Sequence, residues 1–247
     1  MKKENLYDKG FYEEQYRGSI RSADIFLSYL FSYYKPESMV DFGCGVGSWL
    51  FSAEKLGVHS LMGLDGSWVK PESLLSDSID FKPTNFECAV DLNNSFDLAV
   101  SLEVAEHIEE AYANKFVESI CNSSSVVVFG AAIPGQGGID HVNEQFQTYW
   151  VEKFKDRGYS CFDIFRTKYW DDKRIEFWYR QNTFLFVHES KIKSINEEIL
   201  SKPVIMPDLI HPDKYLALVA SHNKIRSIVK PLLPLYRFFN SINLKSR

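Results

Sequence analysis

The sequence predicts a doubly wound α/β fold, in which a mostly parallel β-sheet is covered by helices on both faces. Apolar runs of strand length alternate with segments of helical periodicity, which is the pattern of such folds. A glycine-rich turn at residues 41–47 joins the first strand to a helix. Acidic residues follow the first strands, and in this fold class ligands bind beyond the carboxyl ends of the strands.

The composition narrows the class of protein. The 247 residues are enough for one sizeable core, and their 45% hydrophobic and 25% charged residues are ordinary for a globular protein. A net charge of −5 argues against general nucleic-acid binding. The first residues hold no apolar signal-peptide core, and the four cysteines form no C-x-x-C pair. We therefore expect a soluble, cytoplasmic protein without disulfides.

The expected elements follow from apolar periodicity and from the Gly and Pro residues that interrupt it. Strands are expected at residues 39–42, 61–64, 86–90, 96–102, 126–129, 159–165 and 183–187. Helices are expected at residues 22–34, 46–56, 112–120, 146–157 and 213–227. Only about twenty residues separate the last two strands, which is compatible with an antiparallel pair at the sheet edge.

The strongest functional signal is the turn Asp41-Phe42-Gly43-Cys44-Gly45-Val46-Gly47. Its alternate glycines let the backbone approach a ligand closely. A nicotinamide-binding loop would follow G-x-G-x-x-G, but position 48 is Ser. Asp41 would add negative charge beside a pyrophosphate, whereas it suits a ligand with an ammonium group and no phosphate, such as S-adenosylmethionine. A tight turn without a ligand is the alternative.

Two further acids follow the next strands. Asp65 comes 24 residues after Asp41, where a nucleoside site of this fold places an acid for the ribose hydroxyls. Asp91 follows the expected third strand and would hold the adenine amino group, with Leu92 packed on the ring. For Asp91 alone, a solvated loop acid is the alternative.

These segments, together with Phe96 to Ile108, resemble the successive motifs of class I S-adenosylmethionine-dependent methyltransferases. The last segment is similar to the "fDlv…Ev-x-EHi" signature of that family, and the resemblance covers roughly residues 10–188. It implies a Rossmann-like sheet of seven strands in the order 3-2-1-4-5-7-6, with strand 7 antiparallel. Residues 1–190 would form the methyltransferase domain with an amino-terminal helical cap.

The resemblance also implies how the cofactor S-adenosylmethionine would be held. The glycine-rich turn would meet its methionine part, Asp65 its ribose, and Glu103 would lie beside it at the end of strand 4. The expected cofactor-binding residues are Asp41, Gly43, Cys44, Gly45, Gly47, Asp65, Gly66, Asp91, Leu92 and Glu103.

A second block, residues 134–145, follows the fifth strand and opens a helix. With Tyr149-Trp150 and residues 178–182, it resembles methyltransferases of bacterial glycan and natural-product gene clusters. The resemblance implies O-methylation of a small polar acceptor, a sugar or sugar-linked group such as a phosphoramidate, in surface-glycan (capsule) biosynthesis. The alternatives are an N-methyltransferase of a small metabolite, a non-catalytic binding protein of the same fold, and a nicotinamide oxidoreductase.

Two histidines are candidates for the base that takes a proton from an acceptor hydroxyl, because the imidazole pKa lies near neutrality. His107 and His141 are expected on neighbouring loops at the same end of the sheet. We favour His141, because its glycine-rich loop can close over a substrate; a hydrogen-bonded structural histidine is the alternative for both. No metal site is expected, because the adjacent acids Asp171 and Asp172 have no matching cluster of ligands.

Residues 191–247 are expected to form a linker, a helix and a tail. The stretch 221–247 holds six basic residues, no acidic ones and several large apolar side chains. We therefore predict peripheral, salt-sensitive association with anionic membranes, or with a partner in a membrane-bound glycan assembly. The alternative is that residues 232–239 pack on the catalytic domain.

Overall fold

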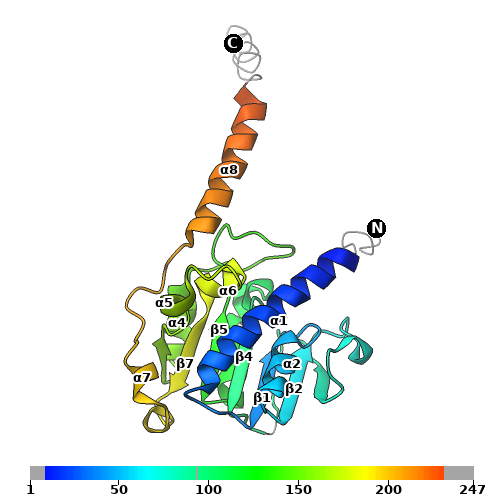
Figure 1. Ribbon diagram of the computed structural model, residues 1–247, viewed down its shortest axis with the longest axis vertical. Helices are drawn as coiled ribbons and strands as arrows, with labels where there is room; N and C mark the ends of the chain where they lie inside the picture. Colours follow the sequence, from blue (N-terminus) through cyan, green and yellow to red (C-terminus); the bar gives the residue numbers. More distant parts are fainter. Residues whose placement is uncertain (1–8, 93, 231–247) are drawn as a thin grey trace. The chain divides into compact units, whose positions relative to one another are not determined.

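The computed structural model of the protein describes residues 9–92 and 94–230. The chain divides into two compact units, one up to residue 209 and one from residue 210. The first unit contains a seven-stranded sheet in the order β3-β2-β1-β4-β5-β7-β6 (Figure 1). Strand β7 is antiparallel to both of its neighbours and the other pairs are parallel, which confirms the predicted fold class and strand order.

The central strands are buried on both faces, as parallel strands covered by helices must be. All residues of β4 and β5 are buried, and apart from Ser101 and Gly130 both strands consist of apolar residues. The strands are β1 (Ser38–Phe42), β2 (Ser60–Asp65), β3 (Ile79–Pro83), β4 (Leu98–Leu102), β5 (Val126–Gly130), β6 (Tyr159–Phe162) and β7 (Phe184–His188).

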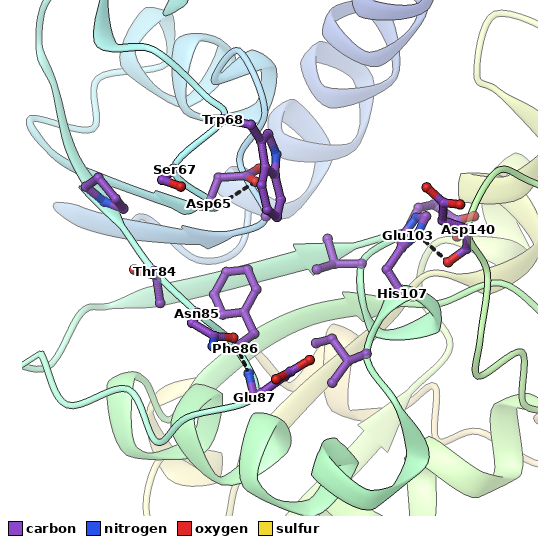
Figure 2. Close-up of a pocket in the computed structure, with 15 residues that line it drawn as sticks. Asp65, Ser67, Trp68, Thr84, Asn85, Phe86, Glu87, Glu103, His107 and Asp140 are labelled. Atoms are coloured by element: carbon purple, nitrogen blue, oxygen red, sulfur yellow. Dashed lines mark hydrogen bonds between the residues drawn. The ribbon is translucent and has the colours of Figure 1, made fainter. Parts of the chain in front are cut away.

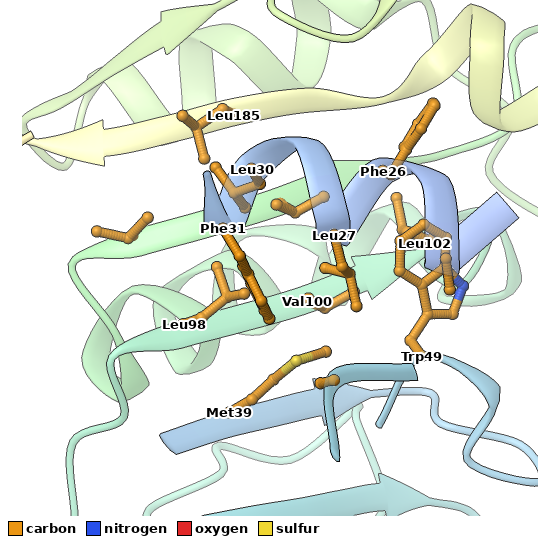
Figure 3. Packing of buried hydrophobic residues seen from close by; sticks show 14 of the residues in the cluster. Phe26, Leu27, Leu30, Phe31, Met39, Trp49, Leu98, Val100, Leu102 and Leu185 are labelled. Carbon is orange, nitrogen blue, oxygen red and sulfur yellow. The ribbon is translucent and has the colours of Figure 1, made fainter. Parts of the chain in front are cut away.

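Helices cover the two faces of the sheet. One apolar cluster joins α1, α2 and α6 to the first face, and a second joins α3 and α4 to the other. Figure 3 shows Leu27, Leu30 and Phe31 of α1 packed over the strands of the first face. The helices are α1 (Lys9–Phe31), α2 (Ser48–Lys55), α3 (Ala113–Ser123), α4 (Gln147–Lys155), α5 (Arg166–Tyr169), α6 (Phe177–Asn182), α7 (Glu197–Leu200) and α8 (Pro212–Val229).

The predicted strand at residues 86–90 is wrong, because the third strand is β3 at Ile79–Pro83. This strand lies at the edge of the sheet and pairs only with β2, so exposed polar residues are tolerated in it. Phe86 and Val90 of this segment pack against α3 instead. Phe86 lies 5.2 Å from Phe116 between ring centroids, and the Val90 amide donates to Ser119 Oγ at 3.0 Å.

The second unit contains α8, which confirms the helix predicted at residues 213–227. His211 caps it, because its Nδ1 accepts a hydrogen bond from the Asp213 amide at 3.1 Å. Among the described residues, no helix combines the length and apolarity that a membrane crossing requires. Most of the predicted basic and apolar tail, from residue 231 on, lies outside the described residues.

Candidate active site

A cavity of about 730 Å³ lies at the carboxyl ends of the parallel strands (Figure 2). Its wall brings together five of the predicted site residues: Gly43, Asp65, Gly66, Glu103 and His107. The rest of the wall comes from the segments that follow β2, β3 and β4 and from one loop residue: Ser67, Trp68, Pro83, Thr84, Asn85, Phe86, Glu87, Val104, Ile108 and Asp140.

The glycine-rich turn between β1 and α2 has the backbone conformation that favours glycine. Gly43 has φ 87°, and a Cβ there would lie 2.2 Å from Val104 Cγ2. Gly45 has φ 53°, but a Cβ there would meet no atom within 4 Å. The turn therefore packs tightly at Gly43 and leaves open space at Gly45, which is the shape needed for a ligand to approach the backbone.

The carboxylate of Asp65 is fixed by two backbone amides of neighbouring segments. Its Oδ2 accepts a hydrogen bond from Gly45 at 2.8 Å, and its Oδ1 accepts one from Gly66 at 2.7 Å. A carboxylate oxygen has two lone pairs, so each oxygen can accept a second hydrogen bond from a ligand hydroxyl. This arrangement suits the predicted contact with a ribose.

Asp41 lies beneath the turn and is not part of the cavity wall. The residue is only 3% exposed, and burial, with the nearby charge of Asp65, raises the pKa of its carboxyl group to about 8. Ionisation of this carboxyl group is therefore unfavourable in its buried environment. A cationic group bound nearby would favour its ionised form.

Asp91 and Leu92 do not line the cavity either. Because β3 ends at Pro83, the residues that face the cavity from this side are Thr84 to Glu87. Asp91 is exposed, and Leu92 packs against the apolar cluster of the second face. The expectation that they contact adenine depended on the misplaced third strand.

Trp68 is a site residue that the sequence analysis missed. Its side chain is 79% exposed and stands beside Asp65 at one end of the cavity, with Phe86 nearby (Figure 2). A Cβ at Gly66 would lie 2.2 Å from the Trp68 ring, so this position of the indole requires glycine at 66. The available signal was a large aromatic residue in a short loop directly after a strand-end acid.

Glu103 follows β4 in the left-handed backbone region, with φ 58°, which is uncommon for a residue other than glycine. Its Oε1 accepts a hydrogen bond from Asn182 Nδ2 at 2.8 Å, and its Oε2 accepts one from Gln136 Nε2. Burial raises the pKa of this carboxyl group to about 7, although the two amides oppose the shift.

The amide groups around Glu103 also bind one another. Gln136 Oε1 accepts hydrogen bonds from Asn182 Nδ2 at 2.9 Å and from Gln181 Nε2 at 3.3 Å. Both residues of α6 are buried. The network therefore connects the end of β4, the loop after β5 and the end of α6 in one polar cluster beside the cavity.

The two candidate bases lie together but differ in access. The rings of His107 and His141 are perpendicular, with centroids 4.8 Å apart. His107 is on the cavity wall, its Nδ1 3.3 Å from the carbonyl oxygen of Asp140, and burial, followed by the charge of His141, lowers its pKa. The His141 side chain is only 12% exposed and outside the wall, with Nδ1 2.8 Å from Glu144 Oε1.

Comparisons with known proteins agree with this geometry. A family model described as a methyltransferase domain matches residues 12–165. The fold is similar to an amino pentose methyltransferase from Micromonospora echinaspora, solved with S-adenosylmethionine bound, at 17% identity, covering 76% of this chain and 100% of that chain, with a TM-score of 0.54. No curated protein sequence matches the chain.

A second similar structure is magnesium protoporphyrin IX methyltransferase from Synechocystis PCC 6803, also with S-adenosylmethionine bound. The identity is 15%, the match covers 70% of this chain and 80% of that chain, and the TM-score is 0.51. The cavity fits this cofactor, because Gly43 brings the glycine-rich backbone to its wall and Asp65 presents two anchored oxygens there. The chain belongs to the methyltransferase domain family and is an S-adenosylmethionine-dependent methyltransferase.

Proposed function

We propose that this enzyme methylates a hydroxyl oxygen of a small polar acceptor, a sugar or sugar-linked group in bacterial surface-glycan biosynthesis. The observation that carries the proposal is the division of the cavity into two ends (Figure 2). Trp68 and Phe86 make one end aromatic, which suits a nucleoside. Glu103, His107 and Asp140 make the other end polar, which suits an acceptor with several hydroxyl groups.

Methyl transfer requires little from the protein beyond aligning the acceptor with the methyl group. S-adenosylmethionine, when bound, supplies a methyl group on a sulfonium that is already a good leaving group. The residues at the polar end therefore mainly orient the acceptor. His107 is the histidine placed to take the hydroxyl proton on a ring nitrogen. In the tautomer with hydrogen on Nδ1, this hydrogen bonds to the Asp140 carbonyl and Nε2 keeps its lone pair.

The loop of residues 134–145 supports the polar end. The Glu144 carboxylate accepts hydrogen bonds from the amides of Gly135 at 2.7 Å and Gly137 at 3.0 Å, so the loop is folded around this side chain. In the same loop, Gln136 donates a hydrogen bond to Glu103 and Asp140 lines the polar end of the cavity. These polar residues support a sugar or phosphoramidate acceptor, and the amino pentose methyltransferase shares only the fold.

The proposal is tested by incubating the protein with S-adenosylmethionine and a panel of sugar nucleotides and sugar phosphoramidates. We expect formation of S-adenosylhomocysteine with at least one acceptor, and an O-methyl signal in the product by NMR. His107→Ala should lower turnover by roughly 10² to 10⁴ with little change in cofactor affinity. The exposed His59 provides the matched control, since His59→Ala should leave turnover unchanged.

An N-methylated product would replace the proposal by the N-methyltransferase alternative. Near-normal turnover of His107→Ala together with a large loss in His141→Ala would return the assignment of the base to His141. Such a result would require His141 to reach the cavity, which it does not line in this structure.

A further inference from the structure

Three side chains of metal-ligand type meet behind the polar end of the cavity, and of these only His107 reaches the cavity wall. One carboxylate oxygen of Glu106 and one ring nitrogen each of His107 and His141 lie within 4.8 Å of one another. His141 Nε2 is 3.9 Å from Glu106 Oε1. Two histidines and one carboxylate are a donor set that holds divalent transition-metal ions and leaves coordination positions open.

Glu106 has a buried carboxyl group whose hydrogen-bonding capacity is not satisfied. The residue is 0% exposed, and neither side-chain oxygen has a hydrogen-bond partner of standard geometry among the described residues. The backbone amides of Glu106 and Ala132 favour the charged form of this carboxyl group, but burial opposes it more strongly. The nearby carboxylates of Glu103 and Glu144 add negative charge. A buried charge without a partner is unfavourable, and a cation at this point would compensate it.

His141 is oriented as metal-binding histidines usually are. Its Nδ1 is bound to the Glu144 carboxylate, and this outer contact fixes the ring and leaves Nε2 for an ion. Glu144 is in turn fixed by the amides of Gly135 and Gly137. A Cβ at Gly138 would lie 2.1 Å from His141 Nε2, so glycine at 138 keeps the space beside this nitrogen open.

Backbone hydrogen bonds hold the two ligand-bearing segments together. The carbonyl oxygen of Glu106 accepts hydrogen bonds from the amides of Val142 and Asn143, both at 2.9 Å. The loop that carries His141 is thereby fastened to the segment that carries Glu106 and His107. The short distances between the three side chains therefore follow from the fold and not from the position of a free loop.

We propose that Glu106, His107 and His141 bind one divalent first-row metal ion, of the type Mn²⁺, Co²⁺ or Zn²⁺, which is reached from the cavity beside His107. Ligand atoms at about 2.1 Å from an ion are closer together than these are, so binding draws the three groups inward by about 1 Å. No metal site was expected from the sequence, where only the adjacent acids Asp171 and Asp172 were considered. His141 lies 34 residues after His107, so the sequence does not show that the two side chains meet.

The role of the ion rests on the proposed function. An acceptor hydroxyl bound to a divalent ion has a lowered pKa and releases its proton to solvent, which leaves the oxygen ready for methylation. His107 is then a ligand of the ion, and the base role proposed for it above applies only to the enzyme without the ion, because a ring nitrogen that binds the ion no longer takes a proton. Metal binding itself requires neither the acceptor nor the cofactor, so it can be tested separately.

The test uses the full chain without a histidine tag, stripped of metal with a chelator. Mn²⁺ binding is followed by electron paramagnetic resonance and calorimetry, and Co²⁺ binding by visible absorption. We expect one saturable site per chain. Glu106→Gln and His141→Gln should each weaken binding by at least about tenfold, and Glu144→Gln by about 10- to 100-fold. His59→Ala is the matched control and should bind normally.

Circular dichroism and thermal unfolding in chelator establish that the variants are folded; Glu106→Gln keeps the size of the side chain and removes its charge. The proposal is overturned if the wild type shows no saturable binding, or if Glu106→Gln and His141→Gln bind as the wild type does. Full turnover in excess chelator overturns the activating role. If Mn²⁺ binds but no acceptor hydroxyl is methylated, the proposed function fails and the metal site stands.

Discussion

Asp65 and Trp68 stand side by side at one end of the cavity, where we propose that they hold the nucleoside part of the cofactor. Asp65 is held by two backbone amides, whereas Trp68 exposes most of its ring to solvent. The exposed indole contributes little to the stability of the free protein, because surface substitutions usually change it by less than about 0.5 kcal/mol. Its position beside the cavity therefore matters mainly for binding.

We expect Trp68→Ala to weaken S-adenosylhomocysteine binding about tenfold or more, since stacking of a base on an aromatic ring contributes about 1–3 kcal/mol. Trp68→Phe, which keeps an aromatic ring, should retain most of the affinity. Calorimetric titration of the three proteins measures this directly. Equal affinity in the wild type and Trp68→Ala would show that the indole does not contact the cofactor.

Asp41 should make the stability of the cofactor-free protein depend on pH. Its pKa is raised from 3.8 to about 8, so the folded chain holds this proton more tightly than the unfolded chain does. The stabilisation is complete below pH 4 and is lost as the pH rises towards 8, by up to about 1.4 kcal/mol per pH unit. Asp41→Asn lacks this dependence and should gain stability relative to the wild type as the pH rises.

Urea unfolding of both proteins at several pH values between 4 and 9 measures the difference. If the free energy of unfolding depended on pH in the same way for both proteins across this range, the raised pKa of Asp41 would be contradicted. The same variant should bind S-adenosylhomocysteine more weakly, because it cannot supply the negative charge that favours an ammonium group.

The site residues that follow a strand end could be predicted from the sequence, and those that depend on loop conformation could not. Asp65 and Gly43 belong to a local strand–turn–helix pattern, so their places follow from neighbouring residues. The choice between His107 and His141 depends on a loop in which Asp140 has φ 59°. A left-handed aspartate has no clear sequence signal, so we favoured the histidine that lies outside the cavity wall.

At the scale of elements, we expect two glycines of the turn between β1 and α2 to have different roles, Gly43 in stability and Gly45 in cofactor binding. Gly43→Ala should destabilise the protein by more than Gly57→Ala does. Both have positive φ, which costs about 1–2 kcal/mol for a non-glycine residue, but only Gly43 also meets the Val104 side chain. Gly45→Ala carries the same backbone strain without a clash, so its stability should resemble that of Gly57→Ala.

Urea unfolding gives the order of stability, and calorimetry separates binding from folding. Gly45→Ala should lose cofactor affinity although it is no less stable than Gly57→Ala, which should bind normally. If Gly45→Ala bound S-adenosylhomocysteine as the wild type does, the open space at this residue would not belong to the cofactor site.

The third strand shows why an edge element is harder to predict than a central one. β4 and β5 are buried on both faces and read as continuous apolar runs. β3 has one partner, and exposed Asp80 and Lys82 interrupt its apolar residues. The more apolar residues 86–90 resembled a strand because Phe86 and Val90 pack against α3, and periodicity alone does not distinguish this packing from that of a strand.

At the scale of the whole molecule, the prediction of membrane association concerns the second unit. The described part of it, α8, exposes several large apolar side chains, including Leu216, Ile225 and Ile228. The full chain should sediment with anionic vesicles at low salt, and a chain ending at Ala220 should not. Each basic residue near an anionic surface contributes about 1 kcal/mol, so added salt should release the protein.

Neutral vesicles are the control for this experiment. If neither chain sediments with anionic vesicles, the basic stretch does not bind membranes. The competing expectation is that residues 232–239, which lie outside the described residues, pack on the catalytic domain. It predicts a lower melting temperature for the shortened chain.

The exposure of Trp68 gives the enzyme an optical signal of its own. Of its five tryptophans, Trp49 and Trp150 are buried, Trp170 and Trp178 are half-buried, and Trp68 alone is exposed. A ligand that covers this indole replaces water around it, so the emission of the protein should shift to shorter wavelength or be quenched. Binding of cofactor and of competing compounds can then be followed by intrinsic fluorescence without a label, with Trp68→Phe as the silent reference.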